Sequence, residues 1–117
     1  GLLREAAAAE FTEHANEELD HAEKLANRII QLGGTPILTP EDWYKKTNCG
    51  YDAPENTDVI AIIKQNIKAE QCAIRVYQKL IEFVKDKDII TYNIVLEILE
   101  DEVEHEDDLE TLLADVE

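Results

Sequence analysis

The chain has 117 residues, enough for one domain, and its 44% hydrophobic residues are too many for a disordered acidic tail. It carries 11 Lys and Arg against 27 Asp and Glu, a formal net charge of −16, which argues against nucleic acid and anionic membranes as partners. No apolar run approaches the ~18 residues that cross a bilayer and no signal peptide opens the chain, so we expect a cytoplasmic protein without membrane contact.

Glycine and proline divide the chain into long helices. Apart from Gly1, all of them lie between residues 33 and 54, and both residue types are costly inside helices. The remaining sequence therefore predicts three helices, at 2–32, 57–85 and 88–116.

The ends of these helices carry capping signals. Gly33 and Gly34 are typical of the end of the first helix. Asn56 or Thr57 is the expected N-cap of the second, with Asp58 in its first turn.

The connections between the helices predict the topology. The short turn at 86–88 makes the second and third helices antiparallel. The segment 33–56 is long enough to run back along a whole helix, which would leave the first two helices parallel. This arrangement predicts an all-α four-helix bundle with one long crossover, of which three helices are present in a single domain, 1–117.

Each predicted helix has an apolar stripe that polar residues interrupt near its middle. The stripes follow spacings of three and four, as one face of a helix requires. A buried carboxylate needs a compensating partner. The interrupting carboxylates and imidazoles are Glu18, His21, Glu70, Glu102 and His105.

These five residues form the pattern of a carboxylate-bridged metal pair. Glu18-x-x-His21 and Glu102-x-x-His105 each place a carboxylate and an imidazole one turn apart on the same helix face, and Glu70 adds a carboxylate from another helix. Oxygen and imidazole ligands favour iron, with manganese and zinc as alternatives, and the lack of a thiolate among them argues against an iron–sulfur site. The competing interpretation is a set of satisfied polar core positions.

Four further residues lie near the predicted ligands. Glu17 and Asp101 are candidates for orienting the imidazoles, with solvent-facing acids as the alternative. His14, two turns before His21, is either a residue of the outer coordination shell or access route, or a partly buried bystander. Tyr77 is either a core aromatic or a hydrogen-bonding partner of the site.

The motifs resemble those of the ferritin-like superfamily, closest to Dps-like ferritins (thioferritins) and bacterioferritins. The resemblance covers essentially the whole chain and rests on three runs of sequence. These runs are Glu18-Leu19-Asp20-His21-Ala22, Glu70 with Ala73-Ile74 and Tyr77, and Ile98-Leu99-Glu100-Asp101-Glu102-Val103-Glu104-His105.

The resemblance assigns a role to each candidate ligand. It implies that Glu18 and Glu102 bridge two iron ions, and that His21, His105 and Glu70 are terminal ligands. The first helix of the family, which carries one more glutamate, has no counterpart here. We therefore expect an N-terminally incomplete bundle.

The resemblance also bears on haem and on the cysteines. Haem-binding bacterioferritins have a methionine directly after the helix glutamate, where this chain has Leu19 and no methionine anywhere, so we expect no haem. Cys49 and Cys72 resemble the cysteine pair of thioferritins, which implies a disulfide or a redox-active dithiol. Two unrelated thiols remain the alternative.

The resemblance implies a ferroxidase, which oxidises Fe(II) with hydrogen peroxide, or with oxygen, for iron storage and protection from oxidative stress. The expected assembly is a homo-oligomer, a cage of twelve subunits. Residues 88–117 carry 12 acids and no Lys or Arg, which we interpret as attraction for Fe(II). The alternatives are a di-iron or di-manganese peroxidase or catalase of rubrerythrin type, and a non-enzymatic acidic helical interaction module.

Overall fold

The computed structural model describes residues 1–116, which form three long helices and one short one. The helices are α1 (Leu2–Gln31), α2 (Pro40–Lys46), α3 (Val59–Val84) and α4 (Ile89–Ala114). The predicted all-α bundle is confirmed, and among the described residues no helix is long and apolar enough to cross a membrane.

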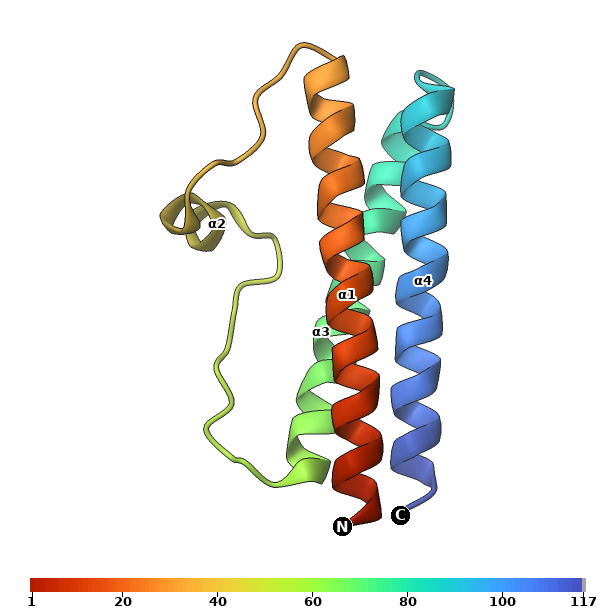
Figure 1. Cartoon of the computed structure of the whole chain (residues 1–117). Coiled ribbons are helices and arrows are strands. Elements are labelled where there is room, and N and C mark those ends of the chain that lie inside the picture. Colours follow the sequence, from red (N-terminus) through yellow and green to blue (C-terminus); the bar gives the residue numbers. More distant parts are fainter. Residues whose placement is uncertain (117) are drawn as a thin grey trace.

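The three long helices lie side by side with the predicted directions (Figure 1). The segment between α1 and α3 returns along the bundle, so these two helices run parallel, and a tight turn makes α4 antiparallel to α3. The two termini meet at one end of the molecule. The crossover topology is therefore as predicted.

The crossover contains a helix that the sequence analysis missed. We expected a loop over the whole of 33–56, but α2 forms within it and stands away from the bundle (Figure 1). Thr39 caps this helix by accepting a hydrogen bond from the Asp42 amide, and Pro40 occupies its first position, where a missing N–H costs nothing. The prediction missed this helix because proline was interpreted only as a residue that interrupts helices, although it also favours the first position of one.

The ends of the long helices differ from the prediction by one or two residues. The N-cap of α3 is Asp58, whose carboxylate accepts from the Ala61 amide, rather than Asn56 or Thr57. The Asn56 side chain instead accepts from the Asp58 amide, one step before the helix. Asp58 is thus the cap itself and not a first-turn residue.

The end of α1 follows the predicted glycine signal. The Gly33 amide bonds to the Ile30 carbonyl and the Gly34 amide to the Ile29 carbonyl, which is the Schellman pattern. Gly33 has φ of 86°, a conformation that residues with a Cβ rarely adopt. This turn redirects the chain from α1 into the crossover.

The interior has a polar layer between two apolar layers. Near the amino end of α1 the apolar core consists of Ala7, Ile63, Ile67 and Leu109. Toward the α3–α4 turn the buried residues are Val84, Val95 and Ile98. Between these layers the buried residues are His14, His21, Glu102 and His105. The interrupted stripes of the sequence therefore correspond to a polar layer inside the bundle.

Two contacts outside the polar layer hold the helices and the crossover in register. Arg28 of α1 donates to both carboxylate oxygens of Asp88, each at 2.9 Å, and to the Thr91 hydroxyl at 2.9 Å. Asp88 is also the N-cap of α4, accepting from the Ile90 and Thr91 amides. A disulfide joins Cys49 of the crossover to Cys72 of α3, the helix that also carries Glu70.

Candidate metal centre

The five predicted ligands converge in the polar layer from α1, α3 and α4. One ligand atom from each of Glu18, Glu70, Glu102 and His105 lies within 4.8 Å of the others. His21 joins them through Nδ1, which lies 3.3 Å from Oε1 of Glu102. The long helices bring these residues together because each carries them near its middle, where His21, Glu102 and His105 are buried and Glu18 and Glu70 are partly exposed.

Each imidazole is held by an acid on the opposite helix. His21 of α1 forms a hydrogen bond of 2.7 Å between Nε2 and Asp101 of α4. His105 of α4 forms the reciprocal bond between Nε2 and Glu17 of α1. Both hydrogen bonds occupy Nε2, so Nδ1 of each ring is the nitrogen left to face the carboxylates. Such outer carboxylates fix the orientation and raise the basicity of a metal-binding histidine.

Two carboxylates lie within reach of both imidazoles. Oε1 of Glu102 is 3.3 Å from Nδ1 of His21 and 3.6 Å from Nδ1 of His105. Oε1 of Glu18 is 3.7 and 3.4 Å from the same two nitrogens. Oε1 of Glu70 is 3.7 Å from Nδ1 of His105, and a ligand atom of Glu70 also lies within 4.8 Å of a ring nitrogen of His14. This geometry suits two bridging carboxylates and one terminal carboxylate.

The five side chains present unpaired polar atoms to one another. Oε1 of Glu18 and Glu102, Oε2 of Glu70, and Nδ1 of His21 and His105 are buried without a hydrogen-bond partner in the described part of the chain. A buried polar atom without a partner costs about 1–3 kcal/mol, so five in one place call for a ligand. Carboxylate oxygens and imidazole nitrogens are ligands of iron, manganese and zinc, and the residues present fit such ions.

The electrostatics of the cluster are those of acids crowded together. Burial and the neighbouring Glu18 and Glu70 raise the pKa of Glu102 to about 11. Burial opposes ionisation of Glu18 as well, but contacts with His105 and Glu102 lower its pKa to about 2. Burial would lower the pKa of His105, yet Glu18, Glu70 and Glu17 together raise it to about 11. The cluster thus favours added positive charge.

The other residues singled out in the sequence also lie at this layer. Burial and the charges of Glu102, Glu18 and Glu70 raise the pKa of Tyr77 to about 12, so its hydroxyl is uncharged at neutral pH. The His14 ring stacks on His105, with centroids 4.0 Å apart. Glu10 and Asp108, which flank His14, were not among the predicted site residues. The spacing of four residues between Glu10 and His14 could have indicated this pair, because it places both side chains on one helix face.

The chain belongs to the ferritin-like family, because the model of the ferritin-like domain matches residues 1–117. Among curated proteins it is 36% identical to a DNA protection during starvation protein of Pyrococcus furiosus, over 97% of this chain and 75% of that protein.

Among solved structures the chain resembles a dodecameric thioferritin, the bacterioferritin-related protein of Bacteroides fragilis. The TM-score is 0.90 at 44% identity, covering 92% of this chain. The chain spans 64% of the length of that structure.

Proposed function

We propose that this chain binds two Fe(II) ions in the polar layer and oxidises them, as the ferroxidase part of an iron-storage protein. The observation that carries the proposal is the set of five unpaired, convergent ligand atoms from Glu18, His21, Glu70, Glu102 and His105. The match to the ferritin-like family supports iron as the metal.

The residues act by holding two ions in reach of one oxidant. Glu18 and Glu102, each near both imidazoles, share their carboxylates between the ions, while His21 and His105 bind one ion each. Glu17 and Asp101 fix the two rings from behind.

The oxidant we propose is hydrogen peroxide, as part of protection from oxidative stress. Two Fe(II) give one electron each to H2O2, and two protons complete the formation of two Fe(III) and two water molecules. Because both electrons leave together, no hydroxyl radical is released.

We further propose a homo-oligomeric cage in which Fe(III) is stored. The support is the resemblance to the dodecameric thioferritin at 44% identity. The relative from Pyrococcus furiosus is named for DNA protection, and the net charge of −16 here favours protection by removal of Fe(II) and peroxide over DNA binding.

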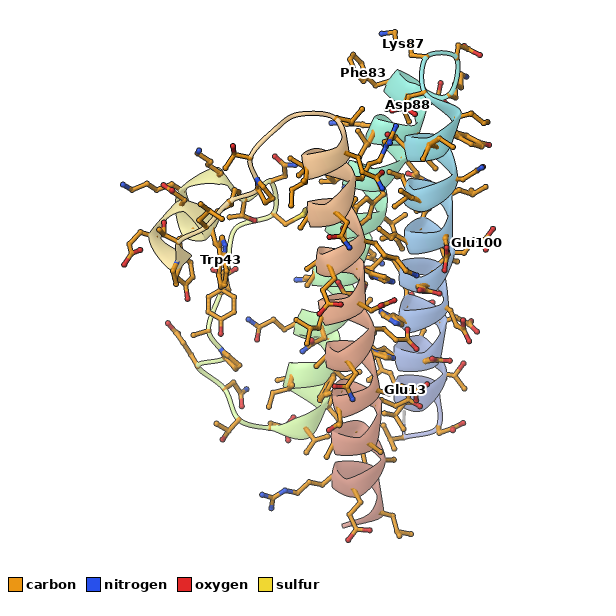
Figure 2. All side chains as sticks on the ribbon, turned by 45° about the horizontal axis from the view of Figure 1, so that its top comes forward. Glu13, Trp43, Phe83, Lys87, Asp88 and Glu100 are labelled. Atoms are coloured by element: carbon orange, nitrogen blue, oxygen red, sulfur yellow. A yellow bond between two sulfur atoms is a disulfide. The ribbon has the colours of Figure 1, made fainter. Side chains whose placement is uncertain are left out.

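Stopped-flow absorbance tests the activity directly. Protein is mixed anaerobically with two Fe(II) per chain and then with H2O2 or with O2, and the rise of Fe(III) absorbance is followed. The protein should accelerate oxidation, more with peroxide, and Glu102→Ala should slow it at least ~10-fold because a shared ligand is lost. Glu100→Gln, an exposed acid on the same helix that Figure 2 shows on the outer side of α4, is the matched control.

Equal rates with and without protein would contradict the proposal. So would an unchanged rate in Glu102→Ala, because oxidation would then occur elsewhere on this acidic chain.

A further inference from the structure

His14 is a buried histidine whose ring makes no hydrogen bond within the described residues. Its residue is only 6% exposed, and neither Nδ1 nor Nε2 has a hydrogen-bond partner within the described residues. Buried side-chain nitrogens are normally paired, so this ring needs an explanation. On its inner side, one ring nitrogen lies within 4.8 Å of ligand atoms of Glu70 and His105, two members of the five-residue cluster.

Two carboxylates face this imidazole from two helices. Nε2 of His14 lies 3.2 Å from Oε2 of Glu10, one turn earlier on α1, and 3.7 Å from Oδ2 of Asp108 on α4. The three ligand atoms lie within 4.8 Å of one another. Oε2 of Glu10 is itself buried and has no hydrogen-bond partner among residues 1–116.

The spacing of these atoms suits a shared cation better than a direct bond. Metal–ligand bonds of ~2.1 Å place neighbouring ligand atoms about 3.0–3.5 Å apart. The imidazole–carboxylate distances of the five-residue cluster run from 3.3 to 3.7 Å, and the distances from His14 to Glu10 and Asp108, 3.2 and 3.7 Å, are similar. Nε2 of His14 and Oε2 of Glu10 lie within ion-pair distance at 3.2 Å, but no hydrogen bond joins them among the described residues.

We propose that Glu10, His14 and Asp108 form a further divalent-cation site beside the five-residue cluster. One imidazole and two carboxylates suit Fe(II), Mn(II) or Zn(II). The side chains of Glu10 and Asp108 are 32% and 39% exposed, which leaves the site open to solvent. On its inner side the His14 ring stacks on His105, so the site adjoins the cluster.

Crystals of the protein soaked in Mn(II) test the site by anomalous diffraction. A peak is expected between Glu10, His14 and Asp108. It should disappear in His14→Phe, whose five-residue cluster is intact, and persist in Glu13→Gln, an exposed acid on the same helix.

A second variant tests the site independently in case His14→Phe does not fold. Asp108→Asn removes a charge from a partly exposed position, and counting of bound Mn(II) by electron paramagnetic resonance should show one ion fewer per chain than in the wild type.

The outcomes separate this site from the proposed function. A peak at this position with an empty five-residue cluster supports the site and counts against the proposed function. No peak at this position overturns the site whether or not the cluster is filled. An unchanged peak in His14→Phe, or an unchanged ion count in Asp108→Asn, overturns it as well.

Discussion

Replacing Glu102 by leucine should reverse the effect of metal on stability. The Glu102 side chain is 2% exposed, and its Oε1 has no hydrogen-bond partner in the described structure. With its pKa raised to about 11, the carboxyl is protonated at neutral pH in the absence of metal and remains incompletely paired. The wild-type residue therefore costs stability until an ion is bound.

The magnitude follows from the unpaired atom. An unsatisfied buried polar group costs about 1–3 kcal/mol, and leucine has a similar size without polar atoms. At roughly 4 °C per kcal/mol for a chain of this length, metal-free Glu102→Leu should melt about 4–12 °C above the metal-free wild type. The wild type should gain about 2.7 kcal/mol when free ion exceeds the dissociation constant a hundredfold, and the variant should gain much less.

Differential scanning calorimetry with chelator and with Mn(II) measures both effects. Glu100→Gln, on the exposed side of the same helix, should behave like the wild type in both conditions. The reasoning is refuted if metal-free Glu102→Leu melts below the metal-free wild type, or if Mn(II) stabilises both proteins equally.

Three further predictions concern the scaffold. The Thr91 hydroxyl and amide and the Arg28 guanidinium lower the pKa of Asp88 in the folded protein. The ionised Asp88 carboxylate therefore stabilises the fold fully above its unfolded pKa of 3.8, and this stabilisation is lost as the pH falls below that value. The difference in Tm between the wild type and Asp88→Asn should shrink from pH 6 to pH 3. Gly33→Ala should lower the unfolding free energy in urea by about 1 kcal/mol, because φ is 86°. Reduction of Cys49–Cys72, which closes a loop of sequence separation 23, should cost about 3 kcal/mol and expose the crossover to proteases.

Each of these has an outcome that would count against it. A pH-independent Tm difference for Asp88→Asn would show that the charge is not what stabilises the α1–α4 contact. No loss in Gly33→Ala would mean that the end of α1 adopts another turn. A reduced protein as protease-resistant as the oxidised one would mean that the crossover packs independently of the disulfide.

The sequence was sufficient for the long helices and the polar layer. Apolar stripes of period 3.6 identify the inward faces, and Ile63, Ile98 and Leu109, which belong to these stripes, are buried. Because the same stripes contain Glu102 and His105, their burial was expected as well. The stripes and the polar residues that interrupt them depend only on spacing within each helix, so they can be identified from one sequence alone.

What the sequence could not supply was the pairing between helices. Glu17 and Asp101 were expected to orient imidazoles, but spacing within a helix cannot show that Glu17 holds His105 and Asp101 holds His21. The relative height of α1 and α4, set by core packing and by the Arg28 contact, decides those partners. The same holds for the approach of Asp108 to His14.

The predicted helix ends were wrong where several neighbouring residues could each cap the helix. Asn56, Thr57 and Asp58 are all acceptable caps, and the choice of Asp58 depends on where α3 meets its neighbours. The start of α2 was missed although Thr39 and Pro40 signal it, because the surrounding glycines and prolines favoured a loop.

Mössbauer spectroscopy of protein loaded with two 57Fe(II) per chain and oxidised with peroxide tests the central claim most directly. If Glu18 and Glu102 bridge two ions between His21 and His105, the spectrum should show a spin-coupled pair of Fe(III) ions, absent in Glu102→Ala. A spectrum of magnetically isolated Fe(III) ions, or a coupled signal that persists in Glu102→Ala, would contradict the account.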